Sequence, residues 1–393
     1  MNTNQLDVTL CSALVEGGIA HYSYCLANAL QAAGVNTTQL MFGWPEYELR
    51  DYPHRQRVVT DLRVANSRLT RLTSPLRNLQ VMLRTAARSQ IVHLQWSLGA
   101  RTDRLHLPVL RALGKSLVYT AHDVLPHESD IMSEQHARWL YHSAGALFVH
   151  GENLKALLVG HFGVDPARVH VIPHGNYNFI PDTPGPWTRA SARASLGLNE
   201  DDRAVLFFGL IRHYKGLDTL IEACRMLKDE PGAGDGQKLK LIIAGRDFRD
   251  HWREGGYEAA IRDGGLEGMV EIHKRHIGMD EIARFFRAAD VLAVPYRRGS
   301  QSGVLRLAYS FGLPAVATSV GSLAEMSGDN VTSFVAPEDP AALASALGKL
   351  LANPELAREI GARARRYADN ELDWDRIAQT TRSVYEGLDA LRH

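Results

Sequence analysis

The chain has 393 residues and a mass of 43.5 kDa, more than one hydrophobic core usually organises, so we expect two domains. Apolar side chains make up 45% of the residues and charged side chains 22%, a composition that argues against a disordered chain. The 44 basic side chains balance 44 acidic ones, which argues against a general nucleic-acid binder.

In the first half of the chain, short runs rich in β-branched and aromatic residues alternate with helix-like stretches. The predicted strands cover residues 8–14, 38–42, 91–96, 116–121, 146–150 and 169–173. Helical patterns lie between them, as at 21–33 and 154–162. This alternation is typical of βαβ units on a parallel sheet.

Residues 178–198 interrupt the alternation with prolines at 181, 184 and 186, which remove backbone donors and restrict the preceding residues. A second series of strands then follows at 204–211, 240–244, 270–273, 291–295, 315–319 and 333–335. Helical patterns separate these strands at 217–227, 279–289, 305–311 and 340–351, and a final one covers 373–391.

These elements predict an α/β protein with two Rossmann-like doubly wound domains that face a cleft. We expect an N-terminal domain at 1–180, a linker at 181–200, a C-terminal domain at 201–370 and a closing helix at 371–393 that packs back on the first domain. In such folds ligands bind beyond the carboxyl ends of the strands.

The first motif at a predicted carboxyl end is Glu16-Gly17-Gly18-Ile19-Ala20. Paired glycines let backbone N–H groups and a helix N-terminus approach an anion or a sugar closely. The motif lacks the G-x-G-x-x-G spacing of dinucleotide-binding proteins. A plain strand-to-helix turn explains it equally well.

The second motif runs from Phe207 through Gly209 to Gly216 and carries Arg212 and Lys215 behind a predicted strand. Arginine offers a fork to phosphate oxygens and lysine adds a mobile charge, so the pair suits a diphosphate. Solvated residues at a helix start are the alternative.

The third motif is the run from Pro295 to Val304, which opens a predicted helix with Gln301, Ser302 and Gly303. Small and hydroxyl residues at a helix start expose backbone N–H groups, and the helix dipole favours an anion there. An N-cap by Ser300 or Ser302 is compatible with a phosphate site.

In the order and spacing of these motifs, the chain resembles the retaining glycosyltransferases of the GT-B fold, specifically family 4 (glycosyl transferases group 1). The resemblance extends over nearly the whole chain. It continues through 244–245, 279–295, 311–318, 321–325, 334–340 and the closing helix at 374–385. Members of this family use nucleotide-sugar donors.

The resemblance implies roles for particular residues. Three are implied to be catalytic: His122, which would touch the transferred sugar, and Arg212 and Lys215, which would hold the diphosphate. The remaining implied contacts are with the substrates: Gly17, Gly18, Asp123, His174, Gly209, Gln301, Ser302, Gly303 and Val304. A packed core histidine remains an alternative for His122.

The chain also departs from the family pattern. Members usually carry two glutamates eight residues apart, but the corresponding stretch 299–308 contains no acidic residue, and Gln301 is a candidate neutral substitute. The arginine lies three residues after Gly209 instead of directly after it. His174 occupies the usual asparagine position, where we interpret it as lining the cleft.

We predict no metal and no other cofactor, since the nucleotide sugar is a substrate. Asp373-Trp374-Asp375 is the only Asp-x-Asp sequence, and acidic residues at a helix start suit its dipole better than they suit a metal. Cationic side chains and a helix N-terminus would then stabilise the departing diphosphate.

The sequence favours a cytoplasmic protein. No apolar run approaches the roughly 20 residues that span a bilayer, no secretory signal is expected, and three cysteines cannot form a disulfide framework. From Leu62 to Thr102 there are seven arginines and no acidic residue. Such a surface suits the inner face of an anionic membrane or a lipid-linked acceptor, although a solvated face is as good an explanation.

We therefore expect a metal-independent hexosyltransferase that moves a sugar from a nucleoside diphosphate to an acceptor hydroxyl with retention. The acceptor would be a sugar, a lipid-linked group or a small molecule, as in polysaccharide or glycolipid biosynthesis, and nucleic acid is not a partner. Two alternatives remain: a nucleotide-sugar epimerase or phosphorylase of the same fold, and a non-catalytic relative that only binds nucleotide sugar or a partner enzyme.

Overall fold

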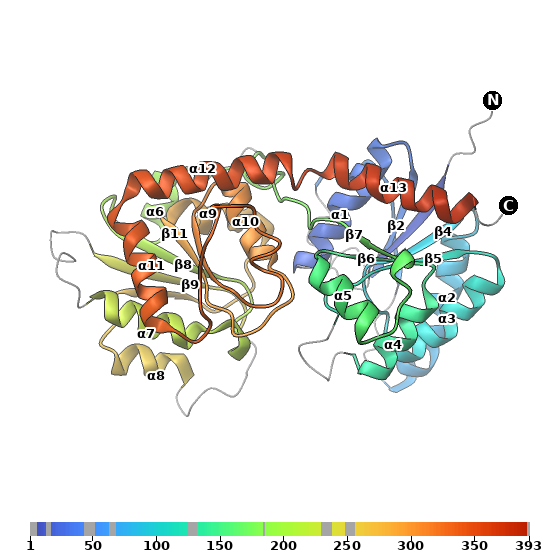
Figure 1. Cartoon of the computed structure of the whole chain (residues 1–393), viewed down its shortest axis with the longest axis horizontal. Coiled ribbons are helices and arrows are strands. Elements are labelled where there is room, and N and C mark those ends of the chain that lie inside the picture. The colour runs from blue at the N-terminus through green and yellow to red at the C-terminus, as the bar shows by residue number, and fades with distance from the viewer. Residues whose placement is uncertain are drawn as a thin grey trace. The chain divides into compact units, whose positions relative to one another are not determined.

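The computed structural model describes residues 6–12, 17–42, 52–62, 68–124, 132–183, 185–228, 238–247 and 256–390. Contacts divide the chain into two compact units (Figure 1). Unit 1 comprises Met1–Gly175 and Leu372–His393, and unit 2 comprises Asn176–Glu371.

The described part of unit 1 contains a parallel sheet in the order β3-β2-β1-β4-β5-β6-β7. Its strands are β1 (Asp7–Ser12), β2 (Asn36–Phe42), β3 (Arg57–Leu62), β4 (Ile91–Leu94), β5 (Ser116–Thr120), β6 (Ala146–Val149) and β7 (Val169–Val171). Its helices are α1 (Gly17–Ala32), α2 (Arg68–Thr85), α3 (Ala100–Ala112), α4 (Glu134–Ser143), α5 (Glu152–Gly160) and α13 (Trp374–Ala390).

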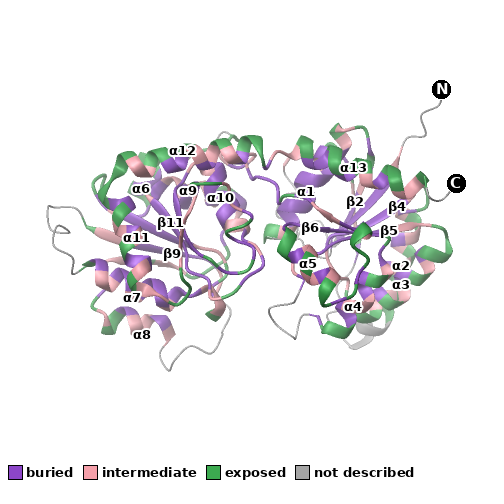
Figure 2. Cartoon of the chain, viewed as in Figure 1, coloured by how far each residue is buried: buried purple, intermediate pink, exposed green. Residues whose placement is uncertain are grey.

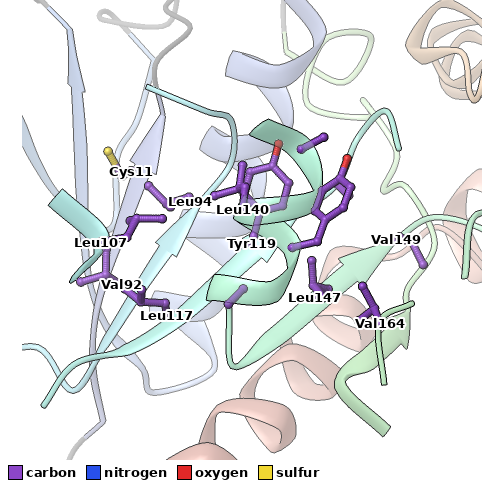
Figure 3. Close-up of a cluster of buried hydrophobic side chains, with 14 of the residues drawn as sticks. Cys11, Val92, Leu94, Leu107, Leu117, Tyr119, Leu140, Leu147, Val149 and Val164 are labelled. Carbon is purple, nitrogen blue, oxygen red and sulfur yellow. The ribbon is translucent and has the colours of Figure 1, made fainter. Parts of the chain in front are cut away.

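Both faces of this sheet are covered, which explains why β4, β5 and β6 are nearly continuous apolar runs. On one face the strands pack with residues of α2, α3, α4 and α5. Figure 3 shows Leu107 of α3 and Leu140 of α4 in this cluster with Leu117 of β5. On the other face the strands pack with α1 and with Ile377 and Tyr385 of α13.

The described part of unit 2 contains a second parallel sheet, in the order β10-β9-β8-β11-β12-β13. Its strands are β8 (Arg203–Phe208), β9 (Leu239–Ala244), β10 (Val270–His273), β11 (Val291–Val294), β12 (Ala315–Thr318) and β13 (Ser333–Val335). Its helices are α6 (Arg189–Ser195), α7 (Leu217–Lys228), α8 (Gly256–Asp263), α9 (Met279–Ala288), α10 (Gly303–Phe311), α11 (Pro340–Ala352) and α12 (Pro354–Asn370).

Figure 2 shows the same layering as burial, with buried strands inside and helices whose outer faces are exposed. Parallel strands need crossover connections, which explains why helices alternate with strands in both sheets. The structure confirms the predicted α/β class with two Rossmann-like sheets. No helix among the described residues is both long enough and apolar enough to cross a bilayer.

The boundary between the units differs from the expected linker at 181–200. Residues from Asn176 onward belong to unit 2, and within the expected linker α6 packs on α9. Arg193 of α6 explains this attachment, because its buried guanidinium donates to the backbone oxygens of Ala288 and Asn199 at 2.9 and 2.7 Å. The proline-rich segment thus leads into a helix of unit 2 instead of spacing the units.

Candidate functional site

The strand order of unit 2 reverses between β8 and β11, and both strands are followed by predicted motifs. The loop after β8 contains Gly209 and a short 3-10 turn, His213–Lys215, whose N-cap is Arg212. The loop after β11 leads to α10. In open parallel sheets such a reversal point leaves room for a ligand at the carboxyl ends of the strands.

Three glycines let the loops at this edge touch backbone to backbone. A Cβ on Gly216 would lie 1.9 Å from the carbonyl oxygen of Pro295, and one on Gly245 would lie 1.7 Å from that of Gly209. A Cβ on Gly321 would lie 1.9 Å from the carbonyl oxygen of Gly299. All three glycines also have positive φ angles, so no other residue fits these positions without displacement of the loops.

The half-buried Lys215 is held over an aromatic ring. Its Nζ lies 3.7 Å from the centroid of the buried Tyr296, a cation–π contact. The hydroxyl of Tyr296 lies 3.2 Å from the Oγ of Ser302. The lysine that follows β8 and the helix start that follows β11 are therefore linked through one tyrosine.

A half-buried arginine of the second loop, Arg297, ties the two motifs together. The backbone N–H of Arg297 donates to the carbonyl oxygen of Tyr214 at 2.8 Å, and its side chain donates to that of His213 at 2.8 Å. The same guanidinium bonds the carboxylates of Asp218 and Glu338 at 2.5 and 3.0 Å. Arg297 is thus a structural clamp that fixes the 3-10 turn bearing Lys215.

Helix α10 begins at this edge. The Oγ of its N-cap, Ser302, accepts a hydrogen bond from the N–H of Leu305 at 3.3 Å. A Cβ on Gly303 would lie 3.2 Å from the hydroxyl of Tyr177, and one on Gly209 would lie 3.3 Å from Cγ2 of Val304. The structure therefore brings the unit 2 residues predicted from the sequence to one sheet edge.

Three buried polar atoms around α10 have no hydrogen-bond partner among the described residues: Gln301 Oε1, Ser322 Oγ and Arg306 Nη1. Such atoms cost free energy when buried alone, which makes them candidates to contact a ligand. The sequence analysis missed Ser322 and Arg306. The position of Ser322 beyond the carboxyl end of β12 was the available signal for it, whereas the inward direction of Arg306 depends on packing.

In unit 1 the glycine pair opens a helix, because α1 begins at Gly17 itself. Gly17 has φ +76 and nothing within 4 Å of an added Cβ, and both Gly17 and Gly18 are exposed. A side chain at Gly17 would therefore meet none of the described atoms. Glu16 lies outside the described residues.

His122 follows β5 and is only 1% exposed. Its Nδ1 lies 3.2 Å from Nε2 of His150, and its Nε2 lies 3.4 Å from Oε1 of Gln95. Burial, and then the neighbouring histidines, hold the pKa of His122 well below its usual value. The ring of Tyr22 on α1 packs edge-on against it, with the centroids 4.7 Å apart.

The other predicted unit 1 residues lie near this cluster. His174 is 2% exposed and packs against Tyr22 and His150. Asp123 directly follows His122 and is half-buried. Asp373 lies elsewhere and caps α13, accepting hydrogen bonds from the N–H groups of Asp375 and Arg376.

Two family models match the chain. Residues 16–175 match the model described as Glycosyltransferase Family 4, and residues 188–367 match the model described as Glycosyl transferases group 1. A D-inositol 3-phosphate glycosyltransferase from Streptomyces griseus is 30% identical over 279 residues, which cover 71% of this chain and 56% of that relative. The matched region thus spans little more than half of this curated relative.

Solved structures match nearly the whole chain. The Thermosynechococcus elongatus sucrose-phosphate synthase superposes with a TM-score of 0.75 at 20% identity, covering 98% of this chain and 100% of that one. The Anabaena protein HepE, solved with UDP-glucose, superposes with a TM-score of 0.74 at 18% identity, covering 97% and 100%. At these identities the likeness confirms the predicted GT-B fold and carries no further conclusion.

Proposed function

Because this chain belongs to the family 4 glycosyltransferases of the GT-B fold, we propose that it moves a sugar from a nucleoside diphosphate to an acceptor hydroxyl with retention of the anomeric configuration. The observation that carries the proposal is the edge of unit 2 where Lys215, Arg212 and the start of α10 follow the two central strands. A diphosphate is the ligand group that such an edge suits.

In the proposed reaction, charge builds on the leaving diphosphate as the sugar–oxygen bond breaks. Lys215 and Arg212 would oppose that charge, and the N–H groups at the start of α10 would donate to its oxygens. The ring of Tyr296 would keep Lys215 in place before the donor binds, which lowers the entropy lost on binding. The leaving phosphate would itself accept the acceptor's proton on the same face, so no protein nucleophile is required.

Gln301 and Ser322 are proposed to replace the missing family glutamates, and Arg306 is proposed to add a donor beside them. Gln301 Oε1 accepts, as a carboxylate does, and would receive a hydrogen bond from a ribose or sugar hydroxyl. Ser322 Oγ would contribute a second contact, and Arg306 Nη1 would donate to an oxygen. His122, Asp123 and His174 would belong to the sugar side, and Gly17 and Gly18 would admit the diphosphate.

No metal has a role in the proposal. Within the described ranges no three His, Cys, Asp or Glu side chains converge in a way that would hold an ion. Arg212 and Lys215 at the unit 2 edge would stabilise the charge of the diphosphate in place of a metal ion. Activity in EDTA equal to activity in Mg²⁺ would support this; restoration of activity by Mg²⁺ would contradict it.

The first test uses nucleotide sugars and the double variant Arg212→Gln with Lys215→Gln. We expect UDP-glucose, the ligand of the HepE structure, to raise the melting temperature of the wild type, beside GDP, ADP and dTDP sugars as alternatives. The double variant should lose this shift and release no nucleoside diphosphate, while its fold is intact by circular dichroism. Transfer by the double variant at the wild-type rate would refute the proposal.

The acceptor is tested in the same assay. The curated relative's name makes D-inositol 3-phosphate the first acceptor to include, followed by sugars and lipid-linked sugars. Conversion of the donor sugar without any acceptor would instead identify an epimerase. Donor binding without diphosphate release over the whole acceptor panel would identify a non-catalytic relative.

We also propose that unit 1 adsorbs to the anionic inner face of a membrane through α2 and α3, which cover the same face of the sheet. Six exposed arginines lie on or beside these helices: Arg77, Arg84, Arg88, Arg101, Arg104 and Arg111. Leu76 and Leu113, 64% and 57% exposed, lie among them. The only acidic residue between Leu62 and Ala121 is the buried Asp103.

Electrostatic attraction, not insertion, would dominate this binding, since the apolar side of α2 faces the core through Met82. Arg63 lies outside the described residues, as do the side chains of Arg68 and Arg71. At about 1 kcal/mol per arginine, Arg77→Gln with Arg84→Gln should weaken binding to phosphatidylglycerol vesicles roughly 30-fold. Arg358→Gln with Arg366→Gln, exposed in unit 2, is the control; equal losses would contradict the proposal.

A further inference from the structure

A chain of hydrogen-bonding side chains crosses the interior of unit 1 at the carboxyl ends of its central strands. It begins at the carbonyl oxygen of Ile172, which lies 3.2 Å from His150 Nδ1. It continues from His150 Nε2 to His122 Nδ1 at 3.2 Å and from His122 Nε2 to Gln95 Oε1 at 3.4 Å. All of these side chains are buried.

Beyond Gln95 the chain reaches the C-terminal helix. Gln95 Nε2 lies 3.1 Å from His93 Nε2, which also contacts Oγ1 of Thr120 at 2.7 Å. His93 Nδ1 lies 2.5 Å from the hydroxyl of Tyr385 on α13. Burial lowers the pKa of His93 to about 3, so this ring is neutral at physiological pH.

A count of the protons on the ring nitrogens shows which orientation of the Gln95 amide is consistent with these contacts. The Ile172 carbonyl and Gln95 Oε1 only accept hydrogen bonds, so His150 Nδ1 and His122 Nε2 must both carry protons. The contact between the two rings needs a third proton. Two neutral imidazoles carry two, so with the amide in this orientation the pair of rings holds one extra proton.

A half-turn of the Gln95 carboxamide removes that requirement, because it exchanges the oxygen and the nitrogen without moving either ring. The amide then donates to His122 Nε2, His122 Nδ1–H donates to His150, and His150 Nδ1–H donates to Ile172. On the other side, His93 Nε2–H donates to Gln95 Oε1 and the Tyr385 hydroxyl donates to His93 Nδ1. With neutral rings each contact of the chain then has a proton, and the His93 Nε2–H is shared between Gln95 Oε1 and Thr120 Oγ1.

We propose that Gln95 is a positioning residue for His122: its carboxamide decides which ring nitrogen of His122 carries the proton. With the neutral pair, Gln95 donates and His122 is held as the Nδ1–H tautomer. His122 Nε2 is then the acceptor of this contact, and a sugar hydroxyl that took the place of the amide would donate to the same lone pair. The functional part of this inference rests on the proposed contact of His122 with the donor sugar.

The groups that face His122 come from four elements: Tyr22 on α1, His93 and Gln95 at β4, His150 after β6 and His174 after β7. Burial is the largest cause that holds the pKa of His122 well below its usual value, so we expect a neutral His122 with the donating amide at neutral pH.

The test is nitrogen-15 NMR of the full chain labelled at histidine, with the His122 signals assigned from a His122→Gln variant. The wild type at neutral pH should show His122 protonated at Nδ1. A neutral His122 protonated at Nε2 would overturn the inference, and this measurement needs no known substrate.

Gln95→Glu supplies the decisive variant. A carboxylate only accepts, so it restores the need for a third proton and should raise the apparent pKa of the histidine pair by about one to three units. Donor KM should rise about tenfold, because His122 Nε2 would then be a donor. An unchanged tautomer and titration, or changed ones with an unchanged donor KM, would overturn the inference.

Gln39→Glu is the matched control, since Gln39 is also fully buried in this sheet but bonds Ser23 and Gln56. It should leave the His122 signals unchanged. The NMR result separates this inference from the proposed function. The spectra show whether Gln95 decides the tautomer of His122 even if the protein uses no sugar donor.

Discussion

At the carboxyl edge of the unit 2 sheet, loops pack backbone against backbone through Gly216, Gly245 and Gly321, and two cations stand beside a helix start. At the corresponding edge of unit 1, side chains fill the space: His122, His150 and His174 pack with Tyr22, and Gln95 links His122 to His93. Unit 2 thus fixes its ligand groups by steric fit and charge. Unit 1 fixes its own groups by hydrogen bonds. Which atom donates in each of them depends on which histidine nitrogens are protonated.

Because the two edges are held together by different interactions, we expect different changes to disrupt their geometry. The unit 2 edge should be sensitive to added atoms and insensitive to mild acid, because its geometry is set by backbone contact. The unit 1 edge should be sensitive to pH, because neutral imidazoles hold it together. The following predictions separate these behaviours, beginning with the largest effect.

Gly216→Ala should destabilise unit 2 by more than about 3 kcal/mol, since its Cβ would overlap the carbonyl of Pro295 at 1.9 Å. Urea unfolding measures the loss. Gly197→Ala is the control: it shares a positive φ, at +64, but has nothing within 4 Å of the added Cβ. It should cost only about 1–2 kcal/mol. Equal costs would show that backbone contact does not define this edge.

Acid should destabilise unit 1 through His93, whose folded pKa of about 3 lies below the unfolded value near 6.5. The unfolded state binds the proton first, so stability is full above pH 6.5 and falls by about 1.4 kcal/mol per unit as pH decreases towards 3. At pH 4.5 the loss is about 3 kcal/mol.

Urea unfolding at several pH values checks this, with His93→Gln as the comparison because glutamine does not titrate. The variant should lose that part of the slope between pH 6.5 and 4.5. If the unfolding free energy changed equally with pH in both proteins, His93 would not be the cause of the acid sensitivity of unit 1.

Tyr296→Leu should raise donor KM about tenfold, because Lys215 loses the aromatic face that holds it and Ser302 loses a hydroxyl contact. Tyr296→Phe keeps the face and loses only the hydroxyl, so its KM should rise less. Identical KM values for the two variants would show that the cation–π contact has no part in donor binding.

Loss of an N-cap gives the smallest effect. Ser302→Ala and Ser133→Ala remove the caps of α10 and α4, and each should cost about 1 kcal/mol of stability. Only the unit 2 variant should also weaken donor binding, measured by calorimetry. Weakened binding in both variants would mean that capping alone, not the place of α10, explains the effect.

Several site residues could be found from the sequence because their signals are local. Arg212 and Lys215 follow an apolar run directly, and the small and hydroxyl residues around Ser302 indicate a helix start. Gln95, His150 and Ser322 also follow strands, but nothing in their neighbours marks them. Their importance comes from side chains far away in the chain, as when His93 meets Tyr385 across 292 positions.

The sequence by itself determined the alternation of strands and helices and the two sheets, since apolar periodicity acts over a few residues. Only the tertiary structure decided that α6 belongs to unit 2 and that three histidines converge on Tyr22, whereas the packing of the closing helix on unit 1 was expected from the sequence. Strand order brings those residues together, and strand order is set by packing between segments that are remote in the chain.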